Sequence, residues 1–253
     1  MAPKTTTAST SRSQLPRQSS SPIKNSYLLA YNALSAVLWA MVLMRTVRDG
    51  MLEGQNKGWF GQRGGYFGFL QGSQDVYARN EEFVRWTQSL AGMEVLHSLF
   101  GVVRAPLITT LMQVSSRFLL VHLIASPFPS TTAPSPAYTT MLLAWSITEV
   151  VRYSYFVFTL SGMGVPRVWQ WLRYNTFLVL YPMGVASECW LVWRASTVVE
   201  GRLNGQGPSG KLGSMLKGGM WGILGVYVPG FYILFTHMLK QRRRIMKGKG
   251  RAE

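Results

Sequence analysis

The residues best suited to chemistry lie in one apolar stretch, LRYNTFLVLYPMGVASE, which ends at Glu188. On a helix, Tyr181 and Glu188 would lie on nearly the same face, about two turns apart, because they are seven residues apart. A charged side chain at membrane depth costs on the order of 3 kcal/mol on insertion scales. No basic residue lies within one turn of Glu188 on this stretch. Glu188 is therefore predicted to serve chemistry, with Tyr181 as its partner.

This stretch belongs to a predicted membrane-spanning helix over about residues 171–193. Pro182 lacks a backbone donor, so we predict a kink in the helix at Tyr181. A carboxylate and a phenol can act as general acid and base without a metal or a redox cofactor. We therefore expect neither a metal nor a cofactor at this site.

Polar and charged residues inside other apolar stretches form a second group of candidates. Glu149, Arg152 and Tyr153 are at positions i, i+3 and i+4, so they share a helical face and can pair. Such residues either orient the acid–base pair or join helices as structural ion pairs. We expect Glu149 and Arg152 to hold the site in shape without doing chemistry. The supporting candidates are Glu94, His97, Arg117, Glu149, Arg152 and Tyr153.

Several enzyme classes lack their signatures in this sequence. The three histidines are not closely spaced, which argues against the histidine clusters of iron-dependent desaturases. Gly-x-Ser-x-Gly is absent. Cys189 is the only cysteine, which excludes an intrachain disulfide and a multi-cysteine metal site. Four residues separate Cys189 from Arg194, one fewer than a cysteine phosphatase loop requires.

The distribution of apolar residues predicts an all-α, polytopic membrane protein. Hydrophobic residues make up 47% of the 253 positions and charged residues 14%, and the apolar positions are bunched into long runs. We predict a bundle of six transmembrane helices. The second span contains charged residues, so a soluble amphipathic helix is its alternative. The predicted spans are about residues 27–44, 83–103, 107–125, 138–160, 171–193 and 220–239.

The predicted organisation is one membrane domain between two polar tails. Residues 1–25 are rich in serine and threonine and are predicted to be a disordered tail, with a transit peptide as the alternative. The six-span catalytic domain covers residues 26–240. It includes a glycine-rich connection over 49–82 and a polar loop over 194–217. Residues 241–253 form a basic C-terminal tail.

The charge distribution predicts the orientation of the bundle. The net charge is +16, and much of the basic excess lies in the two tails. An even number of spans places both tails on one side, and the positive-inside rule makes that side the cytosol. The same charge favours contact with the surface of a lipid bilayer over nucleic acid binding.

Three motifs give the chain a resemblance to a known family. They are MEVLH at 93–97, ITEVVRYSYF at 147–156, and the Tyr-Pro-x-Gly-x-x-x-Glu that ends at Glu188. Together they resemble the 3-hydroxyacyl-CoA dehydratases of very-long-chain fatty acid elongation, a family earlier labelled protein-tyrosine-phosphatase-like. The resemblance covers about residues 27–239. It implies six spans, the endoplasmic reticulum membrane, and dehydration of a 3-hydroxyacyl-CoA to a trans-2-enoyl-CoA.

The resemblance also implies roles and partners. Tyr181 and Glu188 match the family's catalytic tyrosine and glutamate. Dehydration needs a base for the proton alpha to the thioester and an acid for the leaving beta-hydroxyl, and the sequence leaves open which of the two takes the alpha proton. The implied partners are the 3-hydroxyacyl-CoA substrate and other elongation-cycle membrane enzymes. The CoA phosphates would meet basic residues such as Arg104, Arg167 or Arg173. The competing hypothesis is a non-catalytic scaffold or transporter with structural intramembrane charges.

Overall fold

The computed structural model describes residues 22–56, 73–103, 107–203 and 208–249, and every regular element within these ranges is a helix. The all-α prediction is thus confirmed for the described part of the chain. The helices in order are α1 (Pro22–Asn56), α3 (Ser73–Leu90), α4 (Gly92–Leu99), α5 (Leu107–Phe118), the π-helix η1 (Leu119–Ala125), α6 (Pro129–Thr132), α7 (Pro136–Leu160), α8 (Arg167–Asn175), α9 (Phe177–Leu203) and α10 (Pro208–Lys249).

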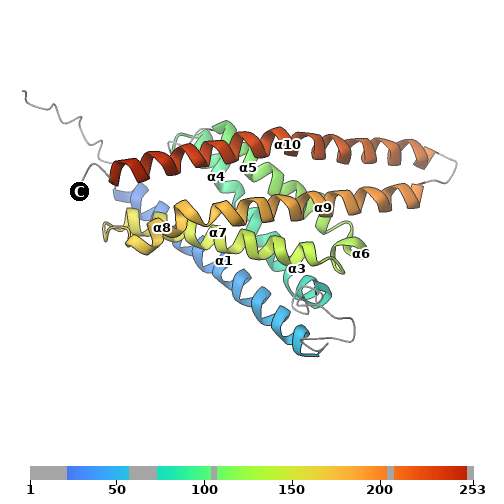
Figure 1. The fold of residues 1–253 in the computed structure, drawn as a ribbon, viewed down its shortest axis with the longest axis horizontal. Helices are drawn as coiled ribbons and strands as arrows, with labels where there is room; N and C mark the ends of the chain where they lie inside the picture. Colours follow the sequence, from blue (N-terminus) through green and yellow to red (C-terminus); the bar gives the residue numbers. More distant parts are fainter. Residues whose placement is uncertain (1–21, 57–72, 104–106, 204–207, 250–253) are drawn as a thin grey trace, which may run out of the picture.

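The long helices pack side by side as a bundle (Figure 1). Helix α7 packs against both α1 and α9, and α10 packs along α9. Helix α3 packs against α1, and η1 contacts α9. The start of α1, the end of α10 and the short helix α8 lie at the same end of the bundle, on the left of Figure 1. We call this the α8 end of the bundle.

The buried core forms where α1, α3, η1, α7 and α9 meet. Trp39 of α1, Leu120 of η1, Tyr138 and Met141 of α7, and Leu191 of α9 are almost completely buried there. Close packing of these large side chains stabilises the bundle through van der Waals contacts between the helices. It also fixes α7 as the central helix on which the neighbouring helices position their polar residues.

The connection predicted over 49–82 is helical at both ends. Helices α1 and α3 extend into it from either side, and its centre, 57–72, lies outside the described residues. The buried carboxylate of Asp49 binds Arg48 of the same helix at 2.9 Å and the Asn80 side chain of α3 at 3.0 Å. The charged end of α1 remains helical because Asp49 binds Asn80 and Arg79 of α3.

The two predicted tails are also partly helical. Helix α1 begins at Pro22, inside the tail predicted over 1–25, and α10 continues to Lys249, inside the tail predicted over 241–253. The sequence Gln-Arg-Arg-Arg-Ile-Met-Lys consists mainly of good helix formers, so nothing stops α10 where its apolar run ends. The rest of both tails lies outside the described residues.

Two further segments differ from the prediction. The polar loop expected over 194–217 is helical on both sides of 204–207, and those four residues lie outside the described part. The second predicted span, 83–103, consists of parts of α3 and α4 with a break at Ala91. Helices thus extend beyond the apolar runs, or break within them, because hydropathy does not determine helix ends.

The helix of the candidate pair bends at Thr176, whereas a kink was predicted at Tyr181. Helices α8 and α9 meet there at 43°, and α9 runs through Pro182 without a break. The Thr176 hydroxyl donates to the Leu172 carbonyl at 2.8 Å. A side chain that binds the backbone in this way often bends a helix.

Among the described residues, two helices can each cross a membrane by length and composition. They are Pro22–Leu52 of α1 and Gly213–Ile245 of α10. The bent pair α8–α9 is a third when it is counted as one span, and Thr110–Ala125 is apolar but shorter. The prediction of six transmembrane helices is therefore not confirmed, whereas two to three candidate spans are found.

Candidate active site

The carboxylate of Glu188 is buried between α9, α7 and α10, and the residue is 6% exposed. The indole N–H of Trp145 on α7 donates to its Oε1 at 2.8 Å. The hydroxyl of Tyr227 on α10 donates to its Oε2, also at 2.8 Å. An ionised carboxylate can accept about four hydrogen bonds. Two neutral donors therefore hold Glu188 in place and leave lone pairs that can meet a substrate.

Close packing of α7 and α9 brings Trp145 to Glu188. Gly184 lies one turn before Glu188 on the same face of α9 and is opposite Ala144 of α7. A Cβ at Gly184 would lie 3.6 Å from the Ala144 Cβ and 4.0 Å from the Glu188 Oε1. Small residues at a helix contact let the two backbones approach closely. The indole can therefore reach the carboxylate.

Tyr181 lies on the same helix, about two turns before Glu188. Its ring stacks on Phe231 and Phe235 of α10, with ring centres 5.2 Å and 6.1 Å away. The planes of the stacked rings differ by 12° and 9°. The stack fixes the phenol against α10. The hydrogen bonds that Glu188 accepts come from other residues, so the predicted pair shares a helix and is not joined by a direct bond in the described residues.

The supporting residues predicted on α4, α5 and α7 form one cluster around Arg152. The Nε of Arg152 donates to Glu149 at 2.7 Å, and its Nη1 and Nη2 donate to the two oxygens of Glu94 at 2.7 Å and 2.6 Å. Arg117 donates to the other oxygen of Glu149, and the Tyr153 hydroxyl donates to Glu94. Two guanidiniums and two carboxylates thus balance each other's charge inside the bundle.

Arg117 connects this cluster to the Glu188 site. Its guanidinium carbon lies 5.1 Å from the ring centre of Trp145, which is a cation–π distance. Trp145 in turn donates to Glu188. Arg117 lies in the last turn of α5, just before the π-helix η1, and π-helical turns are frequent at functional sites.

His97 lies at the edge of the cluster. Its Nε2 forms a hydrogen bond with the Tyr27 hydroxyl at 2.8 Å. The ring of Tyr31 packs edge-on against His97, with ring centres 4.9 Å apart, and also against Tyr153, with ring centres 6.3 Å apart. His97 therefore reaches the cluster through Tyr31, whereas Glu188 is held by Trp145 and Tyr227.

Sequence reasoning missed Trp145 and Tyr227, the two donors to Glu188. Trp145 carried a weak signal, because it lies one turn before Glu149 and a buried indole N–H usually has a partner. Tyr227 is 39 residues after Glu188 and on another helix. No spacing rule relates two residues so far apart, so only the packing of α9 on α10 identifies Tyr227.

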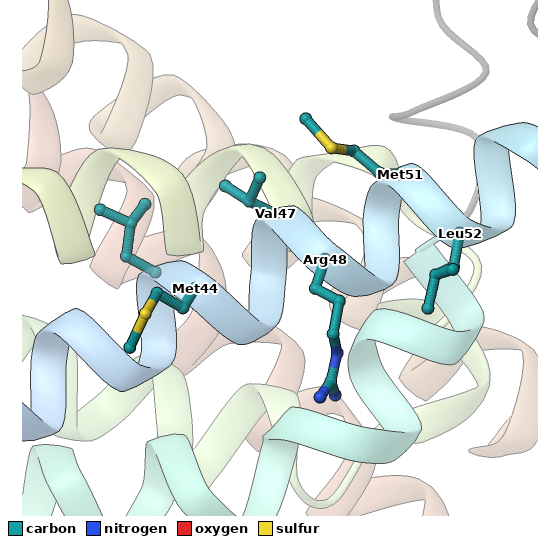
Figure 2. A pocket seen from close by; sticks show the side chains of 6 residues that line it. Met44, Val47, Arg48, Met51 and Leu52 are labelled. Atoms are coloured by element: carbon teal, nitrogen blue, oxygen red, sulfur yellow. The ribbon is translucent and has the colours of Figure 1, made fainter.

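A surface pocket on α1 is separate from this site (Figure 2). Its one charged side chain, Arg48, binds Asp49 of the same helix. The pocket contains none of the predicted catalytic or supporting residues. It is lined by Leu43, Met44, Val47, Arg48, Met51 and Leu52.

Comparison with known proteins identifies the family. The family model described as "Protein tyrosine phosphatase-like protein, PTPLA" matches residues 88–248, which is more than half of the chain. The chain belongs to this family. The PTPLA match includes Tyr181, Glu188, both donors to Glu188 and the whole charged cluster.

Individual PTPLA-family relatives are similar over most of their length. A probable very-long-chain (3R)-3-hydroxyacyl-CoA dehydratase of Schizosaccharomyces pombe is 39% identical over 226 residues, covering 89% of this chain and 95% of the relative. The very-long-chain (3R)-3-hydroxyacyl-CoA dehydratase PASTICCINO 2B of Oryza sativa is 33% identical, with the same coverage. The dehydratase hpo-8 of Caenorhabditis elegans is 33% identical, covering 88% of this chain and 95% of the relative. No solved structure matches the chain.

Proposed function

We propose that this chain is a very-long-chain 3-hydroxyacyl-CoA dehydratase of fatty acid elongation. The observation that carries the proposal is the Glu188 site: a buried carboxylate, held by neutral donors, on the same helix as Tyr181. The family and the names of the relatives support the same reaction, since these relatives align with nearly the whole chain.

The reaction removes water from two neighbouring carbons of the substrate. The C–H bond alpha to the thioester and the C–O bond at the beta carbon break, a carbon–carbon double bond forms, and the proton and hydroxide leave as water. We assign proton transfer at the reacting carbons to Glu188. Tyr181 donates to the leaving hydroxyl or to the thioester oxygen, where negative charge develops. Trp145 and Tyr227 orient the carboxylate for this work.

The charged cluster supports the site and does no chemistry in this proposal. Arg152 ties α7 to α4, and Arg117 ties α5 to α7 through Glu149. Because Arg117 also lies against the ring of Trp145, the cluster holds the indole that orients Glu188. Precise placement of catalytic groups requires such support from neighbouring residues.

We further propose that the bundle lies in the endoplasmic reticulum membrane with six spans and cytosolic termini, beside other elongation-cycle enzymes. Val228, Tyr232 and Ile233 of α10 are 73%, 70% and 56% exposed. An apolar face of this kind suits lipid tails. The basic end of α10 favours the cytosol for the α8 end. Glycosylation reporters fused to each terminus should remain unmodified, and a glycosylated terminus would contradict this orientation.

Turnover by purified protein tests the proposed function. Given 3-hydroxyacyl-CoA substrates of several chain lengths, the protein should release the trans-2-enoyl-CoA, detected by chromatography and mass spectrometry. The acyl chain length of the substrate that is converted fastest would define the preferred substrate. Folded protein that converts none of them would contradict the proposal and favour a scaffold or transporter.

A further inference from the structure

Arg173, at the α8 end of the bundle, is surrounded by aromatic rings. Its guanidinium carbon lies 4.3 Å from the ring centre of Tyr155 and 5.0 Å from that of Phe156, both on α7. The ring centre of Tyr174 is 6.0 Å away. Stacking on rings uses the flat faces of a guanidinium and leaves the N–H groups at its edge able to donate. The rings therefore hold Arg173 ready for a ligand at that edge.

Arg173 differs from the arginines of the interior in its partners. Arg117 and Arg152 each bind a glutamate carboxylate. In the ranges that the structure describes, no carboxylate forms an ion pair with Arg173. A planar guanidinium without a carboxylate partner is well suited to a phosphate, because its N–H groups match two phosphate oxygens in parallel.

A second arginine, on α10, contacts the end of α8. Arg242 donates from Nε and Nη2 to the Asn175 Oδ1, at 3.1 Å and 3.0 Å. Asn175 lies two residues after Arg173, at the end of α8. This contact fixes the basic end of α10 beside α8, so arginines from two helices gather at the α8 end.

The position of Arg173 suits a ligand that also reaches Tyr181. Arg173 precedes Tyr181 by eight positions, which corresponds to at most roughly 12 Å because the chain bends by 43° at Thr176 between them. In an acyl-CoA, the pantetheine arm separates the thioester from the phosphates by a comparable length. One acyl-CoA can therefore place its phosphates near Arg173 and its reacting carbons near Tyr181.

We propose that Arg173 binds the phosphate groups of the acyl-CoA substrate, at the end of the bundle where α10 also brings its arginines. The identity of the ligand rests on the proposed function, and the phosphate chemistry rests on the ring-stacked guanidinium of Arg173. The other basic residues considered from the sequence are weaker choices. Arg104 lies outside the described residues, and Arg167 is exposed.

Kinetics with two substrates test this site. The same 3-hydroxyacyl group is presented on CoA and on pantetheine, which has the thioester and lacks the phosphates. For Arg173→Ala we expect KM for the CoA substrate to rise roughly tenfold or more, with kcat and the pantetheine kinetics unchanged. Arg173→Lys keeps the charge, loses the planar fork and should give an intermediate KM. Equal effects on both substrates would overturn the proposal.

A matched control and a variant-free measurement complete the test. Arg194→Ala removes an exposed arginine further along α9 and should leave both KM values unchanged. Adenosine 3′,5′-bisphosphate should inhibit the wild-type protein competitively against the CoA substrate, which needs no variant to fold. Absence of this inhibition would overturn the proposal.

Two further measurements distinguish this proposal from failure of the proposed function and from binding of a lipid headgroup. Calorimetry measures CoA binding without turnover. If the wild-type protein binds CoA more tightly than Arg173→Ala but converts no substrate, only the proposed function is contradicted. The KM measurements are repeated in nanodiscs with and without phosphatidylinositol. If Arg173→Ala has an effect only with this anionic lipid present, Arg173 serves a lipid headgroup and the proposal is overturned.

Discussion

The bundle holds its buried carboxylates in two different ways. Glu149 is 2% exposed and accepts from two guanidiniums, those of Arg117 and Arg152. Glu188 is 6% exposed and accepts from an indole and a phenol. The first carboxylate is committed to its arginines. The second, among the described residues, has no cationic partner and keeps lone pairs that a substrate can meet.

This difference indicates that the charged cluster supports the structure and that the Glu188 site carries out the chemistry. In the cluster, each charge depends on its neighbours, so removal of one group leaves an uncompensated charge inside the bundle. At the Glu188 site, both donors are neutral, so removal of one donor costs a single hydrogen bond and leaves no unpaired cation. Substitutions in the cluster should therefore lower stability, whereas substitutions around Glu188 should lower the rate.

The largest effect is expected for Tyr181. Tyr181→Phe removes one hydroxyl and keeps the ring that stacks on Phe231, so the protein should fold. A general acid–base group contributes roughly 100-fold to 10,000-fold in rate, and turnover of the purified variant should fall by that order. Tyr232→Phe makes the same change on an exposed face of α10 and serves as the control.

A double variant sharpens this prediction. Tyr181→Phe combined with Glu188→Gln should be little worse than the more damaged single variant, because groups that act as a unit are not additive. If the two losses multiply, Tyr181 and Glu188 act independently and the assignment as a pair is wrong.

A large loss of folding stability is expected when Arg152 is replaced. Arg152→Ala leaves Glu94 and Glu149 without their shared guanidinium, and breaking a buried pair costs roughly 3–5 kcal/mol of stability. The unfolding temperature and the yield of folded protein should both fall. Arg194→Ala, at an exposed position, should change neither. An Arg152→Ala protein as stable as the wild type would contradict the structural role of the cluster.

A smaller effect is expected for the phenol donor to Glu188. Tyr227→Phe removes one hydrogen bond to a charged group and should lower kcat about tenfold while KM stays nearly constant. The exposed Tyr232→Phe is again the matched control. A rise in KM with unchanged kcat would mean that Tyr227 serves substrate binding and does not orient Glu188.

Features fixed within one helix could be predicted from the sequence. The shared face of Glu149, Arg152 and Tyr153 follows from their spacing, and the structure brings them together around Glu94. The placement of Tyr181 two turns before Glu188 follows in the same way.

Features that depend on packing between helices could not be predicted. Tyr227 meets Glu188 because α10 packs along α9, which no sequence spacing encodes. Helix α1 continues past its apolar run because the Asp49 carboxylate accepts a hydrogen bond from Asn80 of α3. The bend lies at Thr176, whose hydroxyl binds the Leu172 carbonyl, whereas the sequence predicted it beside Pro182.

The contrast between Glu188 and Glu149 is tested most directly by kcat of Glu188→Gln and Glu149→Gln, measured in parallel on folded, purified protein. Each change removes ionisation and nearly preserves shape. We predict that Glu188→Gln loses at least roughly 100-fold in kcat at an unchanged unfolding temperature. Glu149→Gln should keep appreciable kcat and unfold at a lower temperature, because two arginines lose a charged partner. Near-normal turnover by Glu188→Gln, or abolished turnover in folded Glu149→Gln, would contradict the assignment.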